Sequence, residues 1–375
     1  MALFIGLMSG TSMDAVDAAL VELNDDSPVL RGSAGLPLPA ELRRELLDLH
    51  RNRNNALEKL ARLDVEMGRL FAATVHALLY KTGIDASRVT AIGSHGQTVY
   101  HQPSGPYPTS MQIGDPNLIA ELTGITTIAD FRRRDIGAGG QGAPLVPAFH
   151  GAVFRSAGKE RVILNIGGIA NITLLPADQG HAVSGFDTGP GNALMDGWAL
   201  EHLGTPRDED GHWAASGTVN NHLLTALLDD PYFSLPPPKS TGREHFNLDW
   251  LREAMGNAGM KNLPPQDVQA TLCELTATSI TRSISDFAPR ARQILICGGG
   301  VHNKALFQRI VALNNTREIA PTTAFGIDPD WVEAMAFAWL AKRTLEGKPG
   351  NLPSVTGARR EVVLGGIYPG GNQSV

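Results

Sequence analysis

The chain has 375 residues, of which 42% are hydrophobic and 19% charged, so it is long enough for two domains with their own cores and is not a disordered protein. A formal charge of −6 argues against a nucleic-acid binder, since such proteins usually present a broad basic face. Two cysteines exclude a disulfide framework, and we expect neither a signal peptide nor a membrane-spanning segment, which predicts a cytoplasmic protein without a membrane partner.

The first half of the chain reads as a β-hairpin followed by mixed helices and strands. Two apolar runs flank a polar, glycine-containing turn, which is typical of a hairpin. Asp115 followed by Pro116 is typical of a helix start. We predict strands at 3–7, 15–23, 91–94 and 125–130, helices at 40–50, 57–80 and 115–123, and a Gly- and Arg-rich loop over 130–147.

The second half has the same pattern of two apolar runs on either side of a glycine turn, here at Gly167 and Gly168. We predict strands at 162–166, 169–175, 182–186 and 294–297, helices at 193–203, 219–228, 265–287, 305–313 and 329–345, and a Pro-rich surface excursion over 231–246. Because each half begins with a strand, a glycine turn and a strand, the sequence predicts two α/β domains that flank a ligand-binding cleft.

The standard nucleotide-binding motifs are absent from the sequence or lack their context. No P-loop sequence G-x-x-x-x-G-K-[ST] occurs. Residues 137–142 match G-x-G-x-x-G, but they follow an arginine run and lead into Ala143-Pro144 rather than joining a strand to a helix. A Rossmann-type dinucleotide site is therefore disfavoured.

Three other glycine elements are candidates for binding phosphate or a flat ligand. Gly10-Thr11-Ser12 offers backbone N–H groups and hydroxyls, with Asp14 and Asp17 just beyond as carboxylates suited to Mg²⁺. Gly167-Gly168 is a second glycine turn, and the triple glycine 298–300 follows an apolar strand. Each also has a plain structural interpretation, as a tight turn or a flexible loop, and these alternatives stay open on the sequence pattern alone.

Longer segments give a more specific signal. The chain resembles the anhydro-N-acetylmuramic acid kinases, a family of the actin-like ATPase and sugar kinase superfamily, over residues from about 3 to 368. One small departure is Ala15, where family members often carry glycine. The segments that carry the resemblance are 6–17 (GLMSGTSMDAVD), 93–98 (GSHGQT), 130–135 (DFRRRD), 139–147 (GGQGAPLVP), 186–192 (FDTGPGN) and 297–300 (CGGG).

The resemblance implies an α/β fold of two actin-like ATPase domains, which are ribonuclease H-like, on either side of a central nucleotide- and substrate-binding cleft. We expect the first domain to comprise residues 1–130 with about 352–375, and the second to comprise 131–351. A homodimer is also implied by the resemblance alone.

The family reaction cleaves the 1,6-anhydro bridge of 1,6-anhydro-N-acetylmuramic acid with water and phosphorylates O6 with ATP, as part of cell-wall recycling. The resemblance implies that Mg²⁺ is a cofactor held by Asp14. It also implies an ATP-binding set of Gly10, Thr11, Ser12, Met13, Asp14, Ala15, Val16, Asp17, Gly167, Gly168, Gly298, Gly299 and Gly300.

For the sugar side, the resemblance implies that Asp187 is the catalytic base and contacts the substrate. Arg134 is expected to bind the sugar or its lactyl carboxylate and to assist catalysis, although three consecutive arginines cannot all face one ligand. Glu333 is a further catalytic candidate, or a residue of a solvated helix face. His95, expected on a loop, and Gln97 are substrate-binding candidates, and a structural role for His95 is an equal alternative.

Two other functions remain open from the sequence. The first is another sugar kinase of the same superfamily, and the second is a non-enzymatic module that closes around nucleotide. Product analysis with the anhydro sugar and ATP separates the first from the family reaction, whereas the second predicts no phosphosugar.

Overall fold

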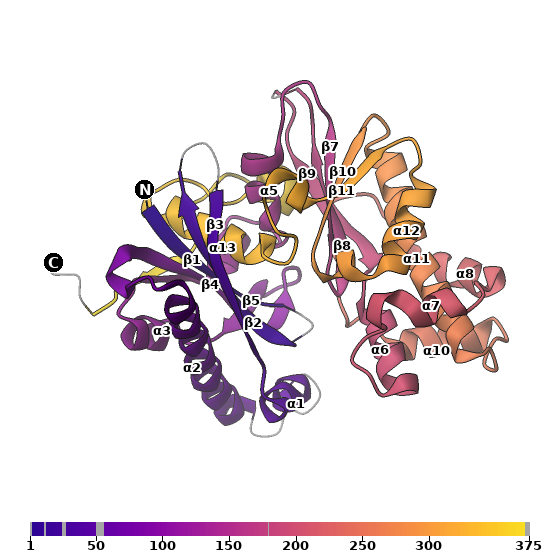
Figure 1. Ribbon diagram of the computed structural model, residues 1–375, viewed down its shortest axis with the longest axis horizontal. Coiled ribbons are helices and arrows are strands. Elements are labelled where there is room, and N and C mark those ends of the chain that lie inside the picture. Colours follow the sequence, from indigo (N-terminus) through magenta and orange to yellow (C-terminus); the bar gives the residue numbers. More distant parts are fainter. Residues whose placement is uncertain (1, 11–12, 25–27, 50–55, 179, 372–375) are drawn as a thin grey trace. The chain divides into compact units, whose positions relative to one another are not determined.

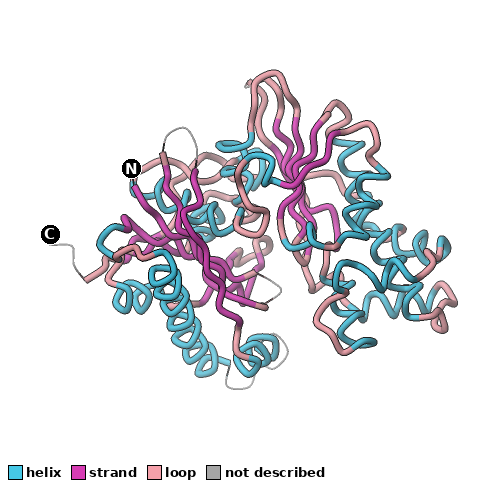
Figure 2. Tube along the Cα trace, viewed as in Figure 1, coloured by secondary structure: helices cyan, strands magenta, loops and turns pink. Residues whose placement is uncertain are grey.

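The computed structural model describes residues 2–10, 13–24, 28–49, 56–178 and 180–371, and it confirms the α/β class. The chain forms two compact units (Figure 1). Unit 1 comprises Met1–Val153 and Trp331–Val375, and unit 2 comprises Phe154–Asp330. Each unit contains one mixed β-sheet with helices packed on it (Figure 2). None of the helices in the described ranges is both long and apolar enough to cross a membrane.

Unit 1 takes its elements from both ends of the chain. They are β1 (Ala2–Ser9), β2 (Ala15–Leu23), β3 (Pro28–Pro37), α1 (Ala40–Leu49), α2 (Ala56–Thr82), the 3-10 helix η1 (Ala86–Arg88), β4 (Val89–Gln102), β5 (Thr109–Ile113), α3 (Pro116–Thr123), β6 (Thr127–Ala129), α4 (Phe131–Gly137), α5 (Val146–Phe154), α13 (Val332–Leu345), α14 (Pro353–Thr356) and β12 (Gly366–Tyr368).

Unit 2 is continuous in sequence. Its elements are β7 (Arg161–Ile166), β8 (Ile169–Leu175), β9 (Ser184–Pro190), α6 (Ala193–Leu203), η2 (Glu209–Gly211), α7 (His212–Ser216), α8 (Asn221–Leu228), α9 (Pro231–Ser234), α10 (Leu248–Asn257), α11 (Pro265–Phe287), β10 (Gln293–Cys297), η3 (Gly299–His302), α12 (Lys304–Leu313), β11 (Glu318–Pro321) and η4 (Thr322–Phe325).

The unit 1 sheet has the strand order β12-β6-β4-β1-β2-β3, with β5 paired to β4. Strand β1 pairs antiparallel with β2 and parallel with β4, so the predicted hairpin lies at the centre of the sheet. Ile5 and Leu7 alternate with Gly6 along β1, and both belong to the core cluster that includes Phe71 and Val75 of α2. One face of the sheet is therefore buried by α2.

Gly6 and Gly93 allow the late helix α13 to approach the strands β1 and β4. A Cβ on Gly6 would lie 1.7 Å from the carbonyl oxygen of Ala334, and a Cβ on Gly93 would lie 2.0 Å from that of Phe337. These distances are far below van der Waals contact, so only glycine fits at either position. Two of the resemblance motifs thus contain a glycine whose role is helix–sheet packing.

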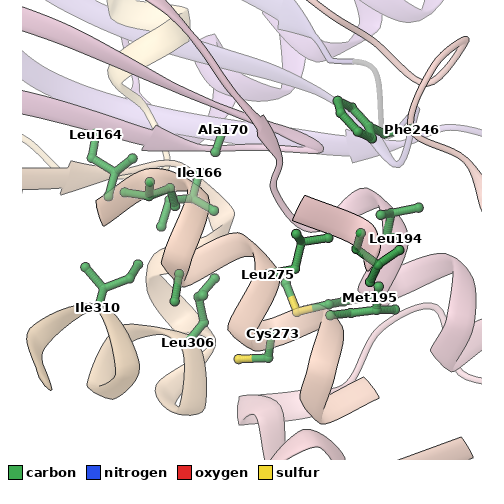
Figure 3. Packing of buried hydrophobic residues seen from close by; sticks show 14 of the residues in the cluster. Leu164, Ile166, Ala170, Leu194, Met195, Phe246, Cys273, Leu275, Leu306 and Ile310 are labelled. Carbon is green, nitrogen blue, oxygen red and sulfur yellow. The ribbon is translucent and has the colours of Figure 1, made fainter. Parts of the chain in front are cut away.

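The unit 2 sheet has the order β11-β10-β7-β8-β9, in which β7 pairs parallel with β10 and antiparallel with β8. All six residues of β7 are buried, which explains its apolar run at 162–164. Helix α11 contacts β8 and β9 and is packed in turn by α6, α7, α8 and α12. Figure 3 shows part of this core, where Leu275 and Cys273 of α11 lie near Leu194 and Met195 of α6.

Most of the predicted helices and strands are present, and those at 193–203 and 265–287 have the predicted bounds. Three predictions were wrong in a way that concerns the site. The loop over 130–147 contains helix α4 and the start of α5, because three consecutive arginines favour a helix. Strand β4 continues through 94–98, because this segment pairs with both β1 and β5. Strand β9 continues past 186 to Pro190.

The unit boundaries also differ from those expected at 130 and 351. Helix α13 packs on β1, β2 and β4, so the chain rejoins unit 1 at Trp331. The buried side chain of Asp135 ties α4 to the C-terminal segment, since its Oδ1 accepts hydrogen bonds from Asn351 Nδ2 at 2.7 Å and Thr356 Oγ1 at 2.8 Å. Residues 131–153 therefore belong to unit 1.

Candidate active site

The first glycine turn joins β1 to β2. Met13 has a left-handed φ of +54°, and its N–H donates to the carbonyl of Gly10 at 3.1 Å. The side chains of Met13 and Val16 are buried in the unit 1 core, so only the backbone of these two residues can contact a ligand. Ala15 is half-buried. The predicted ligands Thr11 and Ser12 lie outside the described residues.

The two carboxylates beyond this turn differ in environment. Asp14 is 65% exposed and forms an ion pair with Arg43 at 3.5 Å. Asp17 lies within β2, opposite Met8 and Gly35, and is half-buried. Within the described ranges, no three His, Cys, Asp or Glu side chains gather as a metal cluster. Asp14 thus fits a metal that takes most of its ligands from phosphate and water, as Mg²⁺ does.

His95 lies on strand β4 rather than on the expected loop, and it is 5% exposed. Its Nδ1 lies 2.8 Å from the carbonyl of Gly96, and its Nε2 accepts hydrogen bonds from Arg132 at 3.1 and 2.8 Å. Burial, and next the Arg132 charge, hold the pKa of His95 well below its usual value. A neutral ring with both nitrogens bonded inside unit 1 supports the structural alternative for His95.

Gln97 is also buried on β4, beside the start of the glycine turn. Its Oε1 accepts a hydrogen bond from Ser9 Oγ at 2.7 Å, and its Nε2 donates to the carbonyl of Thr98 at 3.2 Å. Ser9 directly precedes Gly10, so Gln97 orients the end of β1 that leads into the turn. Its expected contact with the sugar stays a prediction.

The three consecutive arginines of α4 have three different environments. Arg132 donates to His95 and to the carbonyl of Gly142, the latter at 2.7 Å. Arg133 forms an ion pair with Asp130 at 2.7 Å. Arg134 is exposed, and no hydrogen bond or ion pair of its side chain is found within the part of the chain that the structure describes. Arg132 and Arg133 therefore have structural partners. This agrees with the expectation that at least one of the three arginines does not face the ligand.

Glu333 lies in the first turn of α13, where the helix dipole favours a negative charge. Its side chain is half-buried, and the three neighbours Val332, Ala334 and Met335 are buried. Phe337 lies one turn later on the same helix face, and its ring centre is 4.8 Å from that of His95. Glu333 is thus not on a fully solvated helix face.

The second glycine turn packs against the start of helix α6. The carbonyl of Gly168 accepts from the N–H of Gly191 at 2.9 Å and of Ala193 at 3.1 Å, and that of Gly167 accepts from Asn192 at 2.8 Å. These bonds fix the turn to residues 191–193, at the end of the 186–192 motif and the start of α6. Both glycines are half-buried.

The triple glycine follows β10, whose carboxyl end lies beside that of the parallel strand β7. A Cβ on Gly298 would lie 2.3 Å from Asn165 Oδ1, and a Cβ on Gly300 would lie 2.3 Å from Ile166 Cγ2. A Cβ on Gly299 would meet nothing within 4 Å, and this residue is exposed. Close packing therefore explains why residues 298 and 300 are glycines. Nothing within 4 Å explains why residue 299 is a glycine.

Asp187 lies at a β-bulge rather than in the turn where the sequence placed it. It pairs with Asn171 of β8, whereas Ala170 pairs with Gly189, so Thr188 is the extra residue. Bulges bend a strand and re-aim its side chains, and they occur beside active sites. Asp187 is half-buried, and its Oδ2 accepts a hydrogen bond from the N–H of Thr241 at 3.0 Å. The half-buried Asp187 thus lies where the register between β8 and β9 changes.

The segment 231–246, which contacts Asp187, was predicted to be a surface excursion, and this holds only in part, because three of its residues are buried. Tyr232, Lys239 and Phe246 are 4%, 7% and 0% exposed. The Tyr232 hydroxyl donates to the carbonyl of Asp187 at 2.7 Å. Burial raises the pKa of Tyr232 and lowers that of Lys239, and the charge of Asp187 opposes the change at Lys239. The aromatic residues inside the Pro-rich segment were the available signal for burial.

The site residues thus fall into two groups, one in each unit. Unit 1 contains the first glycine turn with His95, Gln97 and Arg134, and Glu333 on α13. Unit 2 contains the second turn, the triple glycine and Asp187 on neighbouring strands of one sheet.

Comparison with known proteins identifies this combination. A family model described as anhydro-N-acetylmuramic acid kinase matches residues 2–370. Proteins with that name from Saccharophagus degradans and Photobacterium profundum are 53% and 51% identical, over 98% of this chain and 98% of each relative. One from Coxiella burnetii (strain RSA 493) is 51% identical over 98% of this chain and 97% of its own length. This protein is therefore an enzyme of the kinase class.

The chain belongs to the anhydro-N-acetylmuramic acid kinase family. Among solved structures, it also matches the ADPNP-bound activator of the 2-hydroxyisocaproyl-CoA dehydratase from Clostridium difficile, at 13% identity and a TM-score of 0.46, over 92% of this chain and 97% of that one.

Proposed function

We propose that this kinase opens the 1,6-anhydro bridge of 1,6-anhydro-N-acetylmuramic acid with water and transfers the γ-phosphoryl group of ATP to O6. The product is N-acetylmuramic acid 6-phosphate, an intermediate of cell-wall recycling. Family membership over nearly the whole chain supports the reaction. The observation that carries the mechanism is the half-buried carboxylate of Asp187 at a bulge, oriented by Thr241.

Asp187 is the general base of the first bond exchange. Its carboxylate takes a proton from water as the water oxygen attacks C1 of the sugar, and the bond from C1 to O6 breaks. O6 leaves with the electron pair of that bond and attacks the γ-phosphorus, and ADP leaves. One proton remains on Asp187 for release to solvent, so atoms and charges balance. Glu333 orients a hydroxyl or the attacking water, and Arg134 binds the lactyl carboxylate.

Kinase membership supports ATP as the phosphoryl donor. The backbone from Gly10 to Asp17 and the turn at Gly167-Gly168 would hold the phosphates, and Gly299 would lie against the adenosine. Mg²⁺ would be held by Asp14, with Asp17 as the second carboxylate, and it would neutralise charge on the phosphates during transfer. We expect the enzyme to act as a homodimer in the cytoplasm, and light scattering on the purified chain tests the homodimer.

The reaction is tested by incubating the full chain with the anhydro sugar, ATP and ¹⁸O-labelled water. The combined reaction gives a 6-phosphorylated sugar with the label on C1 at early times. A phosphorylated sugar that retains the anhydro bridge would indicate an ordinary sugar kinase. Nucleotide binding without any phosphosugar would indicate a non-enzymatic nucleotide-gated module.

Gly299 gives a direct test of the adenosine site. Gly299→Ala is expected to weaken ATP binding about tenfold, which is about 1.4 kcal/mol, because a methyl group would project toward the nucleotide. The fold should be unaffected, since that Cβ meets nothing within 4 Å. Titration calorimetry with a non-hydrolysable ATP analogue measures the affinity. Unchanged affinity would remove Gly299 from the ATP site.

Arg134 is tested against its neighbour on the same helix. Arg134→Ala is expected to raise the KM for the anhydro sugar about 10- to 100-fold, because a charge-assisted hydrogen bond contributes about 1.5–3 kcal/mol. Arg133→Ala is the control, since Arg133 is exposed and pairs with Asp130. Steady-state kinetics at saturating ATP give both values. Equal KM values for the two variants would contradict the assignment.

A further inference from the structure

Three residues of the segment 232–241 form hydrogen bonds with Asp187. The N–H of Asp187 donates to the carbonyl of Lys239 at 3.2 Å, and its carbonyl accepts from the Tyr232 hydroxyl at 2.7 Å. Its Oδ2 accepts from the N–H of Thr241 at 3.0 Å. Strand β9 is the edge strand of the unit 2 sheet, so these bonds fill its free edge at Asp187, next to the bulge at Thr188.

Lys239 contributes to this arrangement from a buried position. Its side chain is 7% exposed, and its ammonium donates to the carbonyls of Tyr232 at 3.1 Å and Phe233 at 3.4 Å. The ammonium lies 4.7 Å from the ring centre of Tyr232 and 5.8 Å from that of Phe186. The ammonium of Lys239 thus fixes Tyr232, and the backbone carbonyl of Lys239 accepts the hydrogen bond from the N–H of Asp187.

Burial of the Lys239 ammonium costs free energy compared with an apolar side chain of similar size. No carboxylate lies within 4 Å of the Lys239 ammonium in the described part of the chain, so the charge is desolvated without an ion pair. A methionine would fill the same space without that desolvation cost. The Lys239 charge and its hydrogen bonds to the two carbonyls are therefore explained by the residues that they hold in place rather than by stability.

We propose that Lys239 is a positioning residue for Asp187. Through Tyr232 and through its own carbonyl, Lys239 holds the peptide of Asp187 on both sides and so sets the direction of the carboxylate. This inference rests on the proposed function, in which Asp187 is the general base.

The decisive variant is Lys239→Met in the full chain. We expect kcat to fall about 100-fold, because a misplacement of about 1 Å at a reacting group has an effect of that size. The KM for ATP should stay within about twofold, since the proposed ATP residues lie on other segments. Tm should fall by no more than a few degrees, because the carbonyls of Tyr232 and Phe233 lose a donor while a desolvated charge is removed. A kcat within threefold of wild type would overturn the proposal.

Tyr232→Phe removes only the hydroxyl that binds the Asp187 carbonyl, and it decides the question if Lys239→Met does not fold. We expect kcat to fall about fivefold with an unchanged KM for ATP, which corresponds to about 1 kcal/mol for the loss of one buried hydrogen bond. Tyr80→Phe is the matched control, because Tyr80 is 92% exposed on α2. Equal kcat values for these two variants would overturn the proposal.

A double variant shows whether Lys239 acts through Asp187. If it does, adding Lys239→Met to Asp187→Asn causes no further loss of activity, whereas independent roles give multiplied losses. If Asp187→Asn alone keeps wild-type activity, the proposed base is wrong. If Asp187→Asn is inactive but both positioning variants are normal, only this inference fails.

Discussion

Asp187→Asn is expected to lower turnover of the anhydro sugar by about 10²- to 10⁴-fold, which is the contribution of a positioned general base. Asparagine has nearly the same shape and keeps an oxygen that can accept the hydrogen bond from the N–H of Thr241. The bulge should therefore persist, and the variant loses the ability to take a proton from water. Binding of a non-hydrolysable ATP analogue should be retained, as calorimetry can show.

Asp249→Asn is the matched control for this experiment. Asp249 lies in unit 2, its side chain is 94% exposed, and its carboxylate pairs only at the surface with Arg252. Such surface pairs contribute at most about 1 kcal/mol, so this variant should keep wild-type turnover. Near wild-type activity of Asp187→Asn in the same assay would remove Asp187 from the catalytic role.

Gly93→Ala is expected to leave little folded protein. The added Cβ would lie 2.0 Å from the carbonyl oxygen of Phe337 and 3.0 Å from the Cβ of Ala341, so α13 must move away from β4. Overpacking of a core usually destabilises by about 1–3 kcal/mol, and a clash with helix backbone belongs to the upper end or beyond it. Thermal unfolding followed by circular dichroism measures the loss.

Gly137→Ala is the control for Gly93→Ala. Gly137 is exposed at the end of α4, and a Cβ there would meet nothing within 4 Å. This variant should unfold within a few degrees of the wild-type Tm. If Gly93→Ala is as stable as Gly137→Ala, close packing of α13 on β4 is not required for folding.

The sequence was sufficient for features that depend on local pattern. Apolar spacing predicted the helix at 265–287 and the hairpins at both glycine turns, because period and turn residues are local properties. The motif 186–192 placed Asp187 at the end of an apolar strand. Its bulge was not predictable, because it depends on the register between β8 and β9 rather than on either strand.

Tertiary contacts decided the features that were missed. The path of β4 through His95 depends on pairing with β1 and β5, which lie far apart in sequence. The prolines in 231–246 disfavour regular structure, but they do not prevent Tyr232 and Lys239 from packing under Asp187. The distinct partners of Arg132 and Arg133 could not be read from three identical residues in a row.

The insertion of unit 2 between the two parts of unit 1 sets an order for synthesis on the ribosome. Unit 2 is continuous and can complete its core once residue 330 has left the exit tunnel. The β1 and β4 strands are made before unit 2, yet the helix that packs on Gly6 and Gly93, α13, follows only after it. Unit 1 therefore cannot complete its packing until unit 2 has been synthesised.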